Sequence, residues 1–252
     1  MDLLPVEIKV NIEGDVAGAL TALGASQGVL MTRRIWFADD RDGAAQGKLL
    51  LLDGGVIVRF RVGGGRDDLT VKLRPCTREQ LVGRFSAPFE VEQLSVTYRI
   101  EEDWSQNGRV LAASLVHDHP PGVLEAAVEP GGDPNAPIDA VQDQFVHACA
   151  RDVRFDGLVA LGPIHSTKVE DVPLDDLEVD LEAWSVAGLD FLEAAIRVKP
   201  KDGDDEDELR ARAERKQRKL EEAVRERGVT LSEVHDSKTH RVLTALVAAA
   251  QG

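Results

Sequence analysis

The chain has 252 residues, and the 43% that are hydrophobic are enough for a substantial core. Its formal net charge is −15, because 45 acidic residues outnumber 30 basic ones. This balance argues against a broad basic surface for DNA or RNA, since such binding depends on neutralising phosphates. We therefore expect no nucleic-acid partner, whereas a local group of cations could still hold a small polyphosphate.

No apolar run reaches the length of a membrane helix, and the opening sequence MDLLPVEIKV has no basic region followed by an apolar stretch. We therefore expect a cytoplasmic protein with no membrane partner. The two cysteines, Cys76 and Cys149, match no metal or redox spacing, so we expect reduced structural thiols. Nothing in the sequence indicates an oligomeric state.

The first predicted strand covers residues 6–12, where apolar and polar side chains alternate. A strand has a period of two, so Glu7 and Lys9 share one face while Val6, Ile8 and Val10 share the other. A short helix is expected next, over residues 15–23 with Asp15 as its cap.

The stretch from residue 53 to residue 75 predicts two strands joined by a glycine-rich turn at residues 63–68. Arg59 and Arg61 share a face of the first strand, and Lys72 and Arg74 share a face of the second. Four cations on one face of a hairpin form a candidate clamp for a polyanion. The ordinary alternative is a solvated polar face of an antiparallel sheet.

The same alternation returns in later segments, with both charge signs on the polar face. Residues 89–92 carry two glutamates, Glu90 and Glu92, residues 177–182 carry Glu178, Asp180 and Glu182, and residues 192–199 carry Glu193, Arg197 and Lys199. In a closed sheet with helices packed outside, such faces would line a lumen.

The remaining segments predict helices and one irregular connection. Residues 138–151 and 236–250 have helical periodicity, with Ile138, Val141, Phe145 and Ala148 on one side of the former. An acidic run at residues 203–208 opens a charged helix with a thin apolar stripe that ends near Gly228. Residues 129–137 are too rich in Pro and Gly for regular structure.

For two further features we favour a structural explanation over a functional one. His117 and His119 could share a metal, but no third ligand stands at a known spacing, so a polar loop after a helix is the better interpretation. Trp36, Trp104 and Trp184 are expected in the core rather than as stacking platforms.

Seven segments together carry a family resemblance. In chain order they are VEIKV, RRIWFADD, LLDGGVIVRFRV, DLTVKLRP, PFEVE, EVDLEAWSVAGLDFLEAAIRV and SKTHRVL. Each is short, but their order resembles the CYTH, or triphosphate tunnel metalloenzyme, superfamily over most of the chain. Its members include class IV adenylyl cyclases, thiamine triphosphatases, inorganic triphosphatases and some RNA triphosphatases.

The resemblance implies an α+β fold, namely an antiparallel β-barrel tunnel with a charged lumen and helices packed outside. It implies one CYTH-like domain over residues 1–252, with an internal loop at 129–137 and a charged surface helix region at 200–228. The implied activity is metal-dependent hydrolysis of an inorganic, nucleoside or small organic triphosphate inside the tunnel.

Site residues follow from the same resemblance, although none is assigned as catalytic. The expected phosphate-binding cations are Lys9, Arg59, Arg61, Lys72, Arg74, Lys168 and Arg197. The expected ligands of Mg²⁺ or Mn²⁺ are Glu7, Asp180, Glu182 and Glu193, because these ions bind through carboxylates and substrate phosphates.

Two departures from the family pattern open a second hypothesis. The family begins Glu-x-Glu-x-Lys, whereas this chain has Pro5 before Glu7 and Lys9, and Ala195 replaces the second glutamate of the late Glu-x-Glu. The alternative is a catalytically degenerate protein that binds a polyphosphate or nucleotide or acts as a regulator. A cyclase is less favoured, since no purine-specific pocket is evident. The retained residues favour the enzyme.

Overall fold

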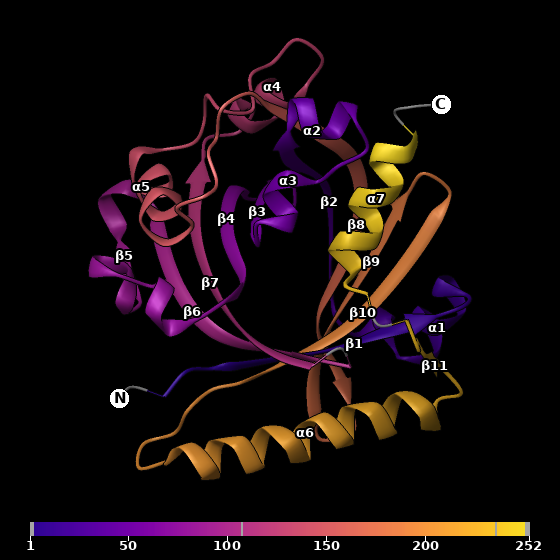
Figure 1. The fold of residues 1–252 in the computed structure, drawn as a ribbon. Helices are drawn as coiled ribbons and strands as arrows, with labels where there is room; N and C mark the ends of the chain where they lie inside the picture. The colour runs from indigo at the N-terminus through magenta and orange to yellow at the C-terminus, as the bar shows by residue number, and fades with distance from the viewer. Residues whose placement is uncertain (1–2, 107, 235, 250–252) are drawn as a thin grey trace. The chain divides into compact units, whose positions relative to one another are not determined.

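The computed structural model describes residues 3–106, 108–234 and 236–249 (Figure 1). Its strands are β1 (Val6–Glu13), β2 (Val29–Asp40), β3 (Val56–Val62), β4 (Asp67–Cys76), β5 (Phe89–Val91), β6 (Val96–Ser105), β7 (Gly108–His119), β8 (Leu158–Leu174), β9 (Leu177–Val186), β10 (Leu189–Val198) and β11 (Thr230–Leu231). Its helices are α1 (Val16–Ala22), α2 (Arg41–Ala45), α3 (Leu50–Asp53), α4 (Val123–Val128), α5 (Ala140–Cys149), α6 (Glu206–Glu226) and α7 (Lys238–Ala249). Ala250, the last residue of the predicted closing helix, lies outside the described residues.

The strands form one sheet in the order β11-β1-β10-β9-β8-β2-β3-β4-β7-β6-β5, and β1 also pairs with β6. This extra pairing joins the order into a ring of nine strands, so the predicted α+β fold with a β-barrel is confirmed. The β1–β6 pairing is parallel, whereas β1 pairs with β10 in the antiparallel direction. The barrel is therefore mixed, which the sequence did not predict.

Two compact units are distinguished within the chain, each built from three segments. The first unit comprises residues 1–32, 101–110 and 166–238, and the second comprises residues 33–100, 111–165 and 239–252. The prediction of a single domain over residues 1–252 stays a prediction. Each unit is described by itself below.

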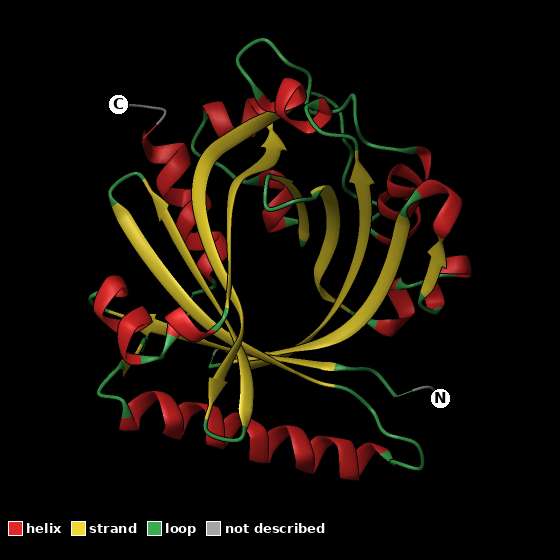
Figure 2. Cartoon of the chain, turned by 180° about the vertical axis from the view of Figure 1, so that it is seen from behind, coloured by secondary structure: helices red, strands yellow, loops and turns green. Residues whose placement is uncertain are grey.

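The core of the first unit lies between its strands and α6. Alternate residues of β1, from Val6 to Ile12, are buried there, while Glu7 and Lys9 lie on the other face as the alternation predicts. The apolar stripe of α6 packs against them through Leu209, Ala213, Leu220, Ala223 and Val224. Figure 2 shows α6 lying along the strands of this unit.

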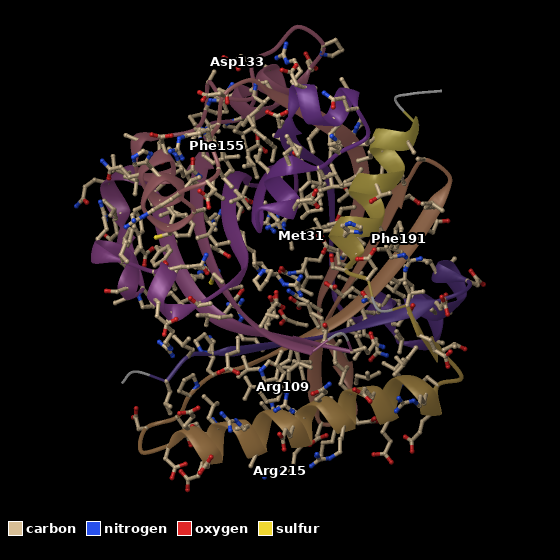
Figure 3. All side chains as sticks on the ribbon, viewed as in Figure 1. Met31, Arg109, Asp133, Phe155, Phe191 and Arg215 are labelled. Atoms are coloured by element: carbon tan, nitrogen blue, oxygen red, sulfur yellow. The ribbon has the colours of Figure 1, made fainter. Side chains whose placement is uncertain are left out.

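The two sides of α6 differ sharply. Arg109 lies over the Trp104 ring, 3.8 Å from its centroid, and pairs with Glu214 of α6 at 3.0 Å. Figure 3 shows Arg109 on the strand side of α6 and Arg215 on the opposite side.

The helix α6 begins after Asp205, whose carboxylate accepts the Glu208 N–H as a cap.

In the second unit, an aromatic cluster joins α5 to the strands. Phe145 of α5 lies 5.1 Å from Phe85 and 5.3 Å from Tyr98, measured between ring centroids. The buried face of α5 consists of Gln142, Phe145, Val146 and Cys149. Phe145 is buried as predicted, whereas Val141 and Ala148 are half-buried and Ile138 precedes the helix. The Gln142 amide, which was not predicted on this face, donates to the Leu69 carbonyl of β4.

The structure also bears on smaller predictions about a helix cap, a loop, the cysteines and the two histidines. Asp15 caps α1, and residues 129–137 lie between α4 and α5 without regular structure. Both cysteines are buried free thiols, and burial raises the pKa of Cys76 to about 11. The loop predicted at His117–His119 was wrong, since these residues end β7. Among the described helices, none has the combined length and apolar character that crossing a membrane requires.

Leu220 tests the role of α6 in stability. We expect Leu220→Ala to lower the free energy of unfolding by about 2–5 kcal/mol, because it leaves a cavity where Leu220 is fully buried. The matched control is Arg215→Ala on the exposed side of the same helix. This substitution should change the free energy of unfolding by about 0.5 kcal/mol or less. Urea denaturation followed by circular dichroism measures both, and equal effects would contradict the packing of α6.

Candidate functional site

The second unit carries the candidate clamp on β3 and β4. Burial alternates along β3 as predicted, with Val58 and Phe60 inside the core and Arg59 and Arg61 on the other face. In the β3–β4 register Arg61 lies opposite Asp68, Arg59 opposite Thr70 and Ile57 opposite Lys72. Within these two strands, this face presents Arg59, Arg61, Lys72 and Arg74 with one carboxylate, Asp68. The cations therefore outnumber the anion there.

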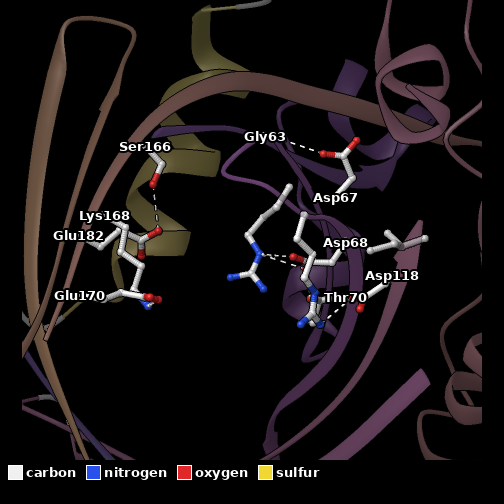
Figure 4. A network of polar contacts seen from close by, with 12 residues as sticks. Gly63, Asp67, Asp68, Thr70, Asp118, Ser166, Lys168, Glu170 and Glu182 are labelled. Carbon is white, nitrogen blue, oxygen red and sulfur yellow. Dashed lines mark hydrogen bonds and ion pairs between the residues drawn. The ribbon is translucent and has the colours of Figure 1, made fainter. Parts of the chain in front are cut away.

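Asp68 fixes the position of Arg61. The Arg61 Nε donates to both carboxylate oxygens of Asp68, at 3.0 Å and 2.9 Å, and the Thr70 hydroxyl donates to the same carboxylate (Figure 4). Burial alone would raise the pKa of Asp68, but Arg61 and Arg59 lower it below its usual value. This ion pair uses the inner nitrogen of Arg61, so its fork of terminal nitrogens takes no part in it.

The predicted turn at residues 63–68 is shorter than expected. Asp67 and Asp68 already belong to β4, and the Asp67 carboxylate accepts the Gly63 N–H at 2.8 Å. Asp67 therefore closes the turn by a local hydrogen bond, and Asp68 can stand opposite Arg61.

In the first unit, Lys9 lies between carboxylates. Its ammonium is 2.6 Å from Glu7 and 2.9 Å from Asp103 of β6, a residue that is almost completely buried. Burial alone would lower the pKa of Lys9, but Glu7, Asp103 and Glu193 raise it well above its usual value. Lys9 is therefore protonated at neutral pH and cannot serve as a general base there.

Arg197 of β10 belongs to the same network. Its guanidinium is 2.7 Å from Glu101 and 3.8 Å from Glu7. The parallel pairing of β1 with β6 places Glu7 beside Asp103, and a hydrogen bond from the Glu102 N–H to the Pro5 carbonyl extends it. The buried carboxylates of Glu101 and Asp103 thus come from a strand that the sequence analysis did not identify.

Lys168 of β8 has carboxylate partners as well. Its ammonium is 2.7 Å from Glu170 and 2.9 Å from Asp180. Burial alone would lower the pKa of Lys168, but hydrogen bonds with Glu170 and Asp180 raise it. The predicted phosphate-binding residue and the predicted metal ligand are therefore partners of each other.

Glu182 and Glu193 converge on Lys238, the first residue of α7. The Lys238 ammonium is 3.2 Å from Glu182, 3.5 Å from Glu193 and 4.0 Å from the centroid of the Trp184 ring. The Ser166 hydroxyl donates to the other oxygen of Glu182 at 3.0 Å (Figure 4). Trp184 is buried, as are Trp36 and Trp104, so the prediction that all three tryptophans belong to the core is confirmed.

These carboxylates do not fit a metal as they are arranged. The four predicted ligands are each in an ion pair with a lysine: Glu7 with Lys9, Asp180 with Lys168, and Glu182 and Glu193 with Lys238. Within residues 3–106, 108–234 and 236–249, no group of three or more His, Cys, Asp or Glu side chains could hold a metal ion. Glu90 and Glu92 are exposed, and His117 pairs with Asp139 at 2.7 Å.

Five residues of the polar networks in the two units were not predicted from the sequence, namely Asp68 in the second unit and Glu101, Asp103, Ser166 and Lys238 in the first. A signal existed for two of them. Glu101 and Asp103 are two residues apart, which on a strand puts them on one face. Lys238 stands in the segment SKTHRVL that carried part of the resemblance, but nothing in the sequence indicates its partners.

The Asp68–Arg61 pair predicts a specific dependence of stability on pH. The folded pKa of Asp68 lies below the unfolded value of 3.8, so its contribution is present above pH 3.8 and is lost as the pH falls through the folded pKa. We expect Asp68→Asn to lower the free energy of unfolding by about 1–3 kcal/mol at neutral pH. The difference from the unmutated protein should shrink in acid, and a difference that stays constant to the lowest accessible pH would contradict the pairing. Urea unfolding of both proteins across a pH series measures it.

No family model and no curated protein matches this sequence. Solved structures do match the fold. One is an adenylyl cyclase candidate from Hippeastrum described as having a dominant triphosphatase activity, with 16% identity, a TM-score of 0.58 and 94% of each chain covered. Another is an adenylate cyclase candidate from Bacillus halodurans, with 12% identity, a TM-score of 0.53, and 95% of this chain and 98% of that chain covered. The chain therefore has the fold of these two solved structures, and its β-barrel is the fold that the order of its segments predicted.

Proposed function

We propose that the protein binds the triphosphate group of an inorganic, nucleoside or small organic triphosphate on the cationic face of β3 and β4 and hydrolyses it. The observation that carries this proposal is the surplus of Arg59, Arg61, Lys72 and Arg74 over Asp68 on that face. The described activity of the Hippeastrum protein agrees with it, although that likeness concerns the fold alone.

Arg61 and Lys72 have defined tasks in this proposal. A triphosphate carries several negative charges, and the planar fork of arginine grips phosphate oxygens through paired hydrogen bonds. Arg61 is oriented by Asp68 through Nε, so its terminal nitrogens are the groups that would meet phosphate. Lys72 would add a point charge from the neighbouring strand.

Hydrolysis would break one P–O–P bond as water attacks phosphorus and the remaining phosphate leaves. Phosphoryl transfer asks little covalent chemistry of a protein, so positioning and charge stabilisation supply most of the acceleration. Mg²⁺ or Mn²⁺ is expected from the resemblance, but the lysine-paired carboxylates do not support a step through a metal.

The first experiment measures phosphate release from inorganic triphosphate, ATP and thiamine triphosphate, each with Mg²⁺, with Mn²⁺ and with a chelator. We expect release that falls by about 100-fold or more in Arg59→Ala plus Arg61→Ala, because removing donors to developing charge costs this much in other enzymes. The matched control is Arg210→Ala plus Arg215→Ala, which removes two exposed arginines from α6.

The control variant should keep full activity and full stabilisation by triphosphate in a thermal melt. Release that survives the β3 double substitution would come from a contaminant or from another site. If triphosphate neither is hydrolysed nor raises the melting temperature of the unmutated protein, the proposed ligand is wrong.

The second candidate function is a protein that binds a polyphosphate or nucleotide without turning it over. Pro5 and Ala195 stand where the family has carboxylates, and the carboxylates that remain are held by lysines. Opposed charges that neutralise one another make a stable interior with no evident chemistry. Binding of a phosphate chain to β3 and β4 would be unaffected by the absence of carboxylates at positions 5 and 195.

Restoring the carboxylate at position 195 separates the two functions. Ala195 lies opposite Lys9 on β1 and opposite Asp180 on β9, so Ala195→Glu adds a carboxylate beside both. If the protein already hydrolyses triphosphate, we expect little change in the rate of phosphate release. A rise of about tenfold or more would instead identify a degenerate site that lacked this ligand. Ala195→Gln is the control of equal size without the charge.

A further inference from the structure

Glu182 and Glu193 form a carboxylate pair that requires a counter-charge. They are directly opposite each other in the antiparallel pairing of β9 with β10. Side chains opposite each other on such strands lie close together on one face, and two like charges in this position destabilise the sheet. Both carboxylates are largely withdrawn from water, with 20% and 15% of their side-chain surface exposed, so solvent screens them only in part.

Lys238 supplies that charge. Its ammonium contacts both carboxylates, at 3.2 Å and 3.5 Å, and 7% of its side-chain surface is exposed. The Trp184 ring covers the ammonium at 4.0 Å, and Ser166 holds the second oxygen of Glu182. Lys238 is also the first residue of α7, where the helix dipole disfavours a cation. The carboxylates and the aromatic ring are therefore what hold it there.

We infer that the Lys238 ammonium takes the place of a divalent cation between Glu182 and Glu193 and keeps metal out of this position. Two carboxylates and one ammonium leave a net charge of −1, whereas a divalent ion alone would neutralise the pair. A divalent ion added beside Lys238 would leave +1 and would meet the repulsion of a cation in the same small space. Metal and Lys238 are therefore mutually exclusive.

The neighbouring position supports this assignment. One step along the same face, Ala195 lies opposite Asp180, so a second opposed carboxylate pair is missing. Asp180 is held instead by Lys168 at 2.9 Å. Carboxylate oxygens are the ligands that Mg²⁺ and Mn²⁺ require, and the three expected metal ligands of these two strands, Asp180, Glu182 and Glu193, each have a lysine partner.

The test measures Mn²⁺ binding to the ligand-free protein by electron paramagnetic resonance, with no triphosphate present. We expect weak binding to the unmutated protein and binding at least about tenfold tighter in Lys238→Met, since a unit charge leaves the carboxylate pair. Methionine has an unbranched apolar side chain of nearly the length of lysine and carries no charge. Adding Glu182→Gln to Lys238→Met should abolish the gain, and Lys238→Arg should bind Mn²⁺ as weakly as the unmutated protein.

Lys238→Gln is a second uncharged variant, which keeps donors for the two carboxylates. Mn²⁺ should raise the melting temperature of either uncharged variant, because an ion that binds only the folded state stabilises it. The inference is overturned if a folded uncharged variant binds Mn²⁺ no tighter than the unmutated protein does. It is also overturned if neither variant folds even with Mn²⁺, or if the unmutated protein binds Mn²⁺ through Glu182. None of these outcomes depends on triphosphate hydrolysis, so this inference and the proposed function fail separately.

Discussion

Successive side chains of a β-strand point to opposite faces of the sheet, so each face has its own requirement for burial or for charge pairing. The apolar face packs on helices such as α6, so charged side chains such as Glu7 and Lys9 of β1, Asp180 and Glu182 of β9, and Glu193 and Arg197 of β10 lie on the other face. Charges gathered there are costly unless they are paired or hydrogen-bonded. The ion pairs and the candidate site both follow from this constraint.

The two units meet the constraint differently. In the first unit, Lys9, Lys168, Arg197 and Lys238 each have carboxylate partners, and several of those partners are buried or half-buried. In the second unit, one face of β3 and β4 carries Arg59, Arg61, Lys72 and Arg74 with one carboxylate of those two strands, Asp68. We proposed the triphosphate contacts on this face because its cations outnumber its carboxylate. In the first unit, the carboxylates expected to bind metal are paired with lysines.

The similarity to solved structures supports the fold of this chain and does not establish its function. With 16% and 12% identity, the two matching structures share the chain path over nearly the whole length. One fold can host unrelated chemistries, so function has to be argued from the side chains at the site. Here those side chains include departures, Pro5 and Ala195, and a residue with an unexpected position, Lys238. The metal that we expected from the sequence resemblance is thus not supported by the arrangement of these side chains.

The sequence by itself determined the facings of β1, β3, β9 and β10, because alternation is a local property of consecutive residues. It also determined the cap of α1, the acidic start of α6 and the order of segments that indicated the barrel. It did not predict β7 at His117–His119, which depends on pairing with β4, or Gln142 on the buried face of α5, where its amide meets the Leu69 carbonyl. Apart from pairs two residues apart on one strand, such as Lys9 with Glu7, tertiary structure decided which charges neutralise one another. Lys9 meets Asp103 across 94 positions of chain and Lys238 meets Glu182 across 56, because ion pairing depends on distance in space and not on distance in sequence.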